Sequence, residues 1–173
     1  MFCLGPFLLL LWTGVVHAKG VYQTPEAFLQ ESFQTEVPSP SLIWLTPERK
    51  QVISNIMSHA YGGLRVRYWA RDGRTAWILE EIGKELPITV GIIVEAGAIQ
   101  QVNILAFRES RGGEVRYPAF TDQFSGAKLG DKQRLDSNID GISGATLSVR
   151  AVKKLARLAL YLHEQTKHGI TKP

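Results

Sequence analysis

The chain has 173 residues, of which 45% are hydrophobic and 21% are charged, and this composition is typical of a globular protein with one core. The formal net charge is +4. The basic residues are scattered along the chain, and no basic segment interleaved with aromatic residues is present, so the sequence does not favour a nucleic-acid-binding protein.

The N-terminal 18 residues have the pattern of a secretory signal. An apolar run over residues 7–16 precedes small residues near Ala18, and it is too short to span a bilayer comfortably, although no Lys or Arg precedes it. We expect a signal peptide at 1–18 and a single domain at 19–173. The alternatives are an uncleaved anchor and a buried helix. The protein is expected to be exported to the periplasm, where it is free or peripheral to the inner membrane.

The only cysteine, Cys3, lies before this apolar run and would leave with the signal. The mature chain would then contain no cysteine. This expectation excludes disulfide scaffolds, thiol catalysis and cysteine-ligated metal sites for the mature protein.

Two helices are predicted in the N-terminal third of the chain, as an extension before the sheet. Each begins with a Thr-Pro-Glu tripeptide, at Thr24 and at Thr46, in which threonine can cap the helix and proline fits its first position. The prolines at 38 and 40 predict an extended connector. The helices are expected to bury Phe28, Leu29 and Phe33, and then Val52, Ile53, Ile56 and Met57, with the second ending near Gly62-Gly63.

Four antiparallel strands are predicted as two hairpins. Apolar and polar residues alternate from Leu64, and the first hairpin turns at Asp72-Gly73. The second joins residues 88–95 to residues 99–107 through Ala96-Gly97-Ala98. Because the sheet must bury a face, we expect an α+β fold in which an antiparallel sheet of about four strands packs with helices.

A long irregular segment over residues 108–139 separates the strands from the last helix. Such a segment in a compact domain is often functional, although it can also be a mobile excursion, and residues 120–124 could form a short structural helix. The last helix is predicted from Val149 to about Gln165. Its cationic side is expected to be a solvated face formed by Arg150, Lys153, Lys154 and Arg157.

A small, hydroxyl-rich and glycine-rich turn leads into this last helix. Its residues are Asp140, Gly141, Ile142, Ser143, Gly144, Ala145, Thr146, Leu147 and Ser148. Free backbone N–H groups at a helix start can bind an anion, and the first turns of this helix hold cations and no acid. The same residues could equally serve only as an N-cap and its neighbours.

The order Asp140, then Ser143-Gly144-Ala145-Thr146, then Ser148 resembles the Asp-x-x-Ser-Gly-Ala-Thr motif of the FMN-binding domain family. This family includes the flavin subunits of the sodium-pumping NADH:quinone oxidoreductase and of Rnf complexes. In the family, a flavin transferase that uses FAD esterifies the threonine to the FMN phosphate. The resemblance therefore implies covalent FMN on Thr146, with Asp140 positioning the turn or assisting transfer.

A second, less specific match follows the second hairpin. Glu109, Ser110, Gly112 and Gly113 stand where the family has a Glu-Thr-x-Gly loop, with Ser110 replacing the usual threonine. The resemblance implies that these residues contact the flavin. Tyr117, Phe120 and Leu129 are further candidates for the wall of a ring slot, although large side chains more often belong to the core.

The resemblance implies an exported electron-transfer flavoprotein that exchanges electrons with membrane or periplasmic redox partners. A redox carrier is favoured over a self-sufficient enzyme. No constellation of histidines and carboxylates stands out in the sequence beyond Glu109, Glu114 and Asp140, and such residues are more often solvated or capping residues. Two alternatives remain: a module that binds flavin or another phosphate ligand without a covalent bond, and an interaction subunit of a membrane redox complex that has lost the cofactor.

Overall fold

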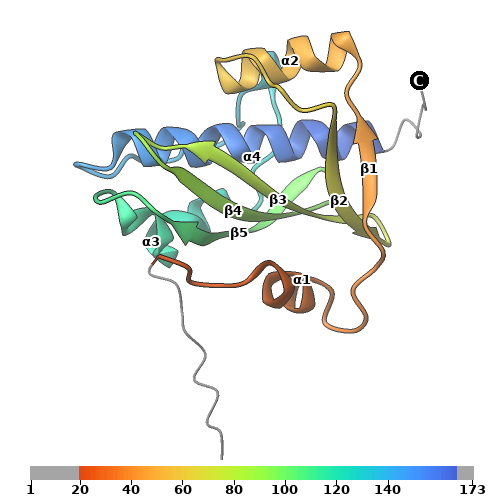
Figure 1. The fold of residues 1–173 in the computed structure, drawn as a ribbon, viewed down its shortest axis with the longest axis horizontal. Coiled ribbons are helices and arrows are strands. Elements are labelled where there is room, and N and C mark those ends of the chain that lie inside the picture. The colour runs from red at the N-terminus through yellow and green to blue at the C-terminus, as the bar shows by residue number, and fades with distance from the viewer. Residues whose placement is uncertain (1–19, 167–173) are drawn as a thin grey trace, which may run out of the picture.

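The computed structural model describes residues 20–166, so the predicted signal peptide and Cys3 lie outside the described residues. An antiparallel sheet of five strands, in the order β1-β2-β3-β4-β5, forms the centre of the fold (Figure 1). The strands are β1 (Ser41–Trp44), β2 (Arg65–Arg71), β3 (Arg74–Ile82), β4 (Pro87–Glu95) and β5 (Ala98–Phe107). The α-helices are α1 (Pro25–Phe33), α2 (Pro47–Met57), α3 (Pro118–Thr121) and α4 (Thr146–Thr166).

The predicted α+β class is confirmed, and both predicted hairpins are present. Asp72 and Gly73 take φ values of 51° and 80° between β2 and β3, and Ala96 and Gly97 take 52° and 76° between β4 and β5. Two consecutive residues with positive φ are what a tight hairpin turn between twisted strands requires. The Asp-Gly pair predicts the first turn for this reason.

The number of strands differs from the expected four. Residues 41–44 form β1, which pairs with β2 so that Ile43 lies opposite Val66. Four residues are too few for an alternating pattern to be recognised, and the prolines at 38 and 40 favour a connector. Pairing with β2 supplies the hydrogen bonds that make this short segment a strand.

Both N-terminal helices begin where the sequence predicts. The Thr24 and Thr46 hydroxyls accept hydrogen bonds from the backbone N–H groups of Ala27 and Arg49, at 3.1 and 3.4 Å. The predicted end of α2 near Gly62-Gly63 is wrong, because the helix ends at Met57. Ser58 stops it by taking a left-handed conformation with φ of 61°, a role more often filled by glycine.

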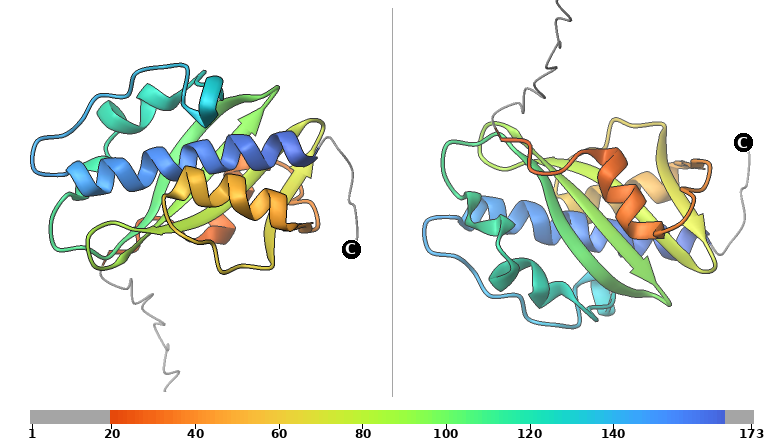
Figure 2. Two further views of the ribbon diagram at one scale, coloured as in Figure 1. Left: turned by 90° about the horizontal axis from the view of Figure 1, so that it is seen from above. Right: turned by 90° about the horizontal axis from the view of Figure 1, so that it is seen from below.

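Helices cover both faces of the sheet, as the two views of Figure 2 show. The α2 and α4 helices lie on one face, and α1 lies on the other, where Phe28 and Leu29 pack with Ala76 and Leu105. As a result, β4 is buried on both sides from Ile88 to Val94. This burial explains why its sequence is almost continuously apolar instead of alternating.

The long α4 helix crosses the sheet with its predicted apolar side buried, including Val152, Leu155 and Leu162. It begins at Thr146, three residues before the predicted start. No helix among residues 20–166 is long and apolar enough to cross a bilayer.

The basic side of α4 is mostly not the solvated face that the sequence predicts. Lys153 Nζ donates to the Ile139 carbonyl at 2.9 Å, and Arg157 Nη2 donates to the Ile56 carbonyl at 2.7 Å. Arg150 is exposed, as expected. The prediction fails for the other cations because residues distant in sequence, on α2, β3 and the long loop, supply acceptors for them.

A buried carboxylate, Glu81 on β3, ties α2 and α4 to the sheet. Its side chain is 7% exposed and accepts from His59 Nε2 at 2.9 Å and from Lys154 Nζ at 3.1 Å. The Ala60 carbonyl and the Glu81 carboxylate raise the pKa of His59 above its ordinary value of 6.5. The two cations therefore share one buried acid.

Replacing this acid should lower stability and weaken its dependence on pH. Because folding raises the pKa of His59, its stabilisation is complete below about pH 6 and is lost as the pH rises through the folded pKa. Urea unfolding of Glu81→Gln should show a loss of about 3 to 5 kcal/mol, since Lys154 keeps a largely buried charge without its partner.

The matched control for this variant is Glu85→Gln, whose side chain is 70% exposed. It should change the free energy of unfolding by less than about 0.5 kcal/mol. If Glu81→Gln unfolded with the same stability and the same slope against pH as the control, the role assigned to Glu81 would be wrong.

Candidate functional site

The turn that precedes α4 is fixed by its own hydrogen bonds and by its neighbours. The Ala145 N–H donates to the Ile142 carbonyl at 3.0 Å, and Gly144 takes a φ of 81° inside this turn. The Asp140 N–H donates to Gln123 Oε1 at 2.7 Å, while the Asp140 carboxylate accepts from Asn138 Nδ2 at 3.0 Å. The turn is therefore held to the 3-10 helix at Asp122–Phe124, which follows α3, before α4 begins.

Thr146 is the first residue of α4, and its side chain is exposed. Ser143 and Gly144 before it are also exposed, so little bulk flanks its hydroxyl. The first turn of the helix contains no acidic residue that would oppose a bound anion. A reactive partner can approach the Thr146 hydroxyl from solvent.

The structure brings the two predicted site segments together at one point. Gly112, with φ of 85°, lies so close to α4 that a Cβ atom on it would be 2.6 Å from Ser148 Oγ and 3.4 Å from Ala145 Cβ. Ser148 is only 4% exposed, and Gly113 packs near the ring of Phe107. The loop after β5 and the start of α4 therefore form one contiguous surface.

Glu109 has a different partner. Its Oε1 accepts from the backbone N–H groups of Lys84, Glu85 and Leu86 at 2.5, 2.6 and 2.9 Å. Desolvation opposes the charge, but these three donors outweigh it and lower the pKa of Glu109. Glu109 thus fastens the β3–β4 turn to the loop after β5, while Ser110 is exposed. Flavin contacts by these two residues stay predictions.

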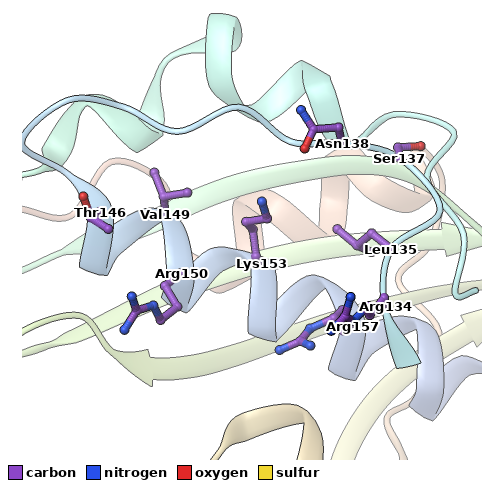
Figure 3. Close-up of a pocket in the computed structure, with 9 residues that line it drawn as sticks. All are labelled: Arg134, Leu135, Ser137, Asn138, Thr146, Val149, Arg150, Lys153 and Arg157. Carbon is purple, nitrogen blue, oxygen red and sulfur yellow. The ribbon is translucent and has the colours of Figure 1, made fainter. Parts of the chain in front are cut away.

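A pocket of about 550 Å³ extends from Thr146 along α4 (Figure 3). The long loop forms its other wall, so that residues separated in sequence face the same helix. Its lining is Arg134, Leu135, Ser137, Asn138, Thr146, Val149, Arg150, Lys153 and Arg157. None of these described residues is acidic, and the walls combine apolar side chains with four cations.

Residues 83–161 match the family model of the FMN-binding domain. The match supports an FMN-binding domain family and the binding of FMN by this chain. It covers β4, β5, the long loop, the turn before Thr146 and α4 as far as Tyr161. The comparison with curated proteins gives no match.

The pocket fits the chemistry of FMN, a flat apolar ring system that carries a phosphate group. Its volume lies within the range of about 300 to 1,000 Å³ that is usual for small-molecule sites. Leu135 and Val149 supply apolar surface, and the cations along α4 suit a negatively charged group. Thr146, at one end of this pocket, lies inside the segment that matches the FMN-binding domain.

Sequence reasoning found only part of this pocket. It identified Thr146 and the turn before it, but Arg134, Leu135, Ser137 and Asn138 were not among the predicted residues. The spacing of Arg150, Lys153 and Arg157 after the motif was the available signal, since residues three and four apart share a helix face.

The aromatic candidates for a ring slot lie elsewhere. Phe120 is 2% exposed and packs edge-on against Phe124 with ring centroids 5.4 Å apart, which is a core position. Tyr117 is half exposed and contacts the Arg116 guanidinium. Leu129 is partly buried against the main core. None of the three lines the pocket beside Thr146.

The contact between Gly112 and Ser148 predicts a measurable difference between two glycines. Gly112→Ala and Gly144→Ala both place a side chain at a φ above 80°, but only the first meets a neighbour within 4 Å. Urea unfolding of the flavin-free chain should show that Gly112→Ala loses about 1 to 3 kcal/mol more than Gly144→Ala.

A double variant separates this contact from backbone strain. Adding Ser148→Ala to Gly112→Ala removes the oxygen that lies 2.6 Å from the new Cβ and should restore part of the lost stability. If Gly112→Ala and Gly144→Ala lost the same stability, and Ser148→Ala did not change the effect of Gly112→Ala, the contact between Gly112 and Ser148 would be disproved.

Proposed function

We propose that this chain carries FMN bound covalently through a phosphoester to Thr146 and acts as an exported electron-transfer flavoprotein. The observation that carries the proposal is the position of Thr146. It is an exposed hydroxyl at the first residue of α4 and at one end of a cationic pocket, within the part of the chain that matches the FMN-binding domain.

The attachment reaction requires a partner enzyme and FAD. The Thr146 oxygen attacks the phosphorus on the riboflavin side of the FAD diphosphate, the bond between the two phosphates breaks, and AMP leaves. The hydroxyl proton is lost to the transferase or to solvent. The chain gains the mass of FMN less one water. An exposed threonine flanked by Ser143, Gly144 and Ala145 suits an enzyme that must reach the hydroxyl.

Once FMN is attached, the residues beside Thr146 have distinct roles. The N–H groups in the first turn of α4 and the nearby Arg150 would stabilise the negative charge of the phosphodiester. Leu135 and Val149 would exclude water from the ring, and Lys153 would place a positive charge along the same wall. FMN supplies the redox chemistry, and the protein orients it.

The proposed role is to pass electrons between membrane or periplasmic redox partners outside the cytoplasm. A covalent bond suits that compartment, because a cofactor lost there would be hard to replace. This role makes the protein a carrier, and Thr146 an anchor instead of a general acid or base.

The test is the intact mass of the full chain produced in cells that contain a flavin transferase. The wild-type protein should gain FMN less water and stay yellow after denaturation. Thr146→Val, which keeps the shape of the side chain and removes the hydroxyl, should be unmodified and lose essentially all covalent flavin.

The matched control is Ser125→Ala, which removes an exposed hydroxyl outside the motif and outside the pocket beside Thr146. It should retain the modification. Flavin released by denaturation of the wild type would favour a non-covalent binding module, and a colourless wild-type protein would favour a subunit without cofactor. Covalent flavin on Thr146→Val would move the attachment site elsewhere.

A further inference from the structure

We propose that Arg134 and Arg157 form a binding site for an oxyanion, the phosphate or carboxylate group of a small organic molecule. The site lies at the end of the pocket opposite Thr146 (Figure 3). The inference concerns a second anion site and does not rest on the covalent bond at Thr146.

The Arg157 guanidinium is fixed in place but only partly satisfied. Its Nη2 donates to the Ile56 carbonyl at 2.7 Å, which holds the side chain against the end of α2. Its Nε is buried and has no acceptor among residues 20–166. A buried N–H without an acceptor is unfavourable, so the Arg157 guanidinium is held in place without all of its hydrogen bonds being satisfied, while the residue also lines the pocket.

Arg134 adds a second positive charge at this end of the pocket. Arg134 and Arg157 line the same end of the pocket (Figure 3), and burial together with the positive charge of Arg134 lowers the pKa of Arg157. The described lining of the pocket contains no carboxylate to neutralise them. Two neighbouring guanidinium groups can bind a phosphate or carboxylate group through paired N–H donors.

The site is separate from the attachment point. Arg157 follows Thr146 by eleven residues on one helix, which corresponds to about 16 Å along its axis. A phosphate esterified to Thr146 would therefore not contact Arg157 directly. The pocket of about 550 Å³ extends over this distance, from Thr146 to Arg157.

The experiment is a calorimetric titration of the full chain without flavin, with inorganic phosphate as the probe and sodium chloride to match ionic strength. Saturable binding is expected. Arg134→Gln should weaken it by roughly tenfold, because one charge-assisted pair of hydrogen bonds is lost. No side-chain hydrogen bond of Arg134 is among those found in the described residues, so this variant should fold normally.

Two further variants make the result specific. Arg67→Gln removes an exposed arginine on β2 outside this pocket and should leave phosphate binding within about twofold. Arg157→Lys keeps the charge but replaces the planar guanidinium with an ammonium that cannot donate paired hydrogen bonds, and it should also weaken binding by roughly tenfold. Absence of saturable binding, or equal binding by Arg134→Gln and Arg67→Gln, would overturn the site.

The same titration on chain that carries flavin identifies the source of the oxyanion. Retained phosphate binding would support a separate small molecule at Arg134 and Arg157. Loss of phosphate binding after flavin loading would show that the attached flavin covers both arginines, and it would overturn a separate oxyanion site. If the flavin-free chain binds phosphate but Thr146 is never modified, the oxyanion site stands while the proposed carrier function fails.

Discussion

The candidate site depends on one close packing contact, in which the loop after β5 meets the start of α4 without space for another carbon atom. Gly112 lies against Ser148 and Ala145, and the hydrogen bond from Lys153 to the Ile139 carbonyl holds the preceding segment to the same helix. The long loop is therefore not an excursion from the fold. It is one wall of a pocket whose other wall is α4, and Thr146 sits where the two walls meet.

The charges on α4 are divided between structure and site. Lys154 is engaged with buried Glu81, and Arg157 holds the end of α2 through the Ile56 carbonyl. Arg157 also lines the pocket, as do Arg134, Arg150 and Lys153, so the pocket carries positive charge along its whole length. The match to the FMN-binding domain ends within α4, at Tyr161. Elements outside the matched residues, including α2 and β3, hold this helix in place.

The fold class, both hairpins and the apolar side of α4 could be predicted because they depend on local periodicity and on turn residues such as Asp72-Gly73. The segment recognised from the sequence, roughly residues 88–162, agrees closely with the matched residues 83–161. Contacts between distant residues could not be predicted. The four-residue β1 becomes a strand only by pairing with β2, and Lys153, Lys154 and Arg157 are partly buried because the long loop, β3 and α2 supply acceptors for them. Arg134 and Leu135 could not be predicted as pocket residues for the same reason. No local sequence pattern indicates which residues of a long loop will face a helix.

The measurement that tests the central claim most directly is tandem mass spectrometry of the tryptic peptide from Leu135 to Arg150, taken from chain produced with a flavin transferase. This peptide contains Thr146 together with Ser137, Ser143 and Ser148, so fragmentation distinguishes every hydroxyl near the turn. We predict a single FMN phosphoester on Thr146. An unmodified peptide, or flavin on one of the serines, would contradict the account.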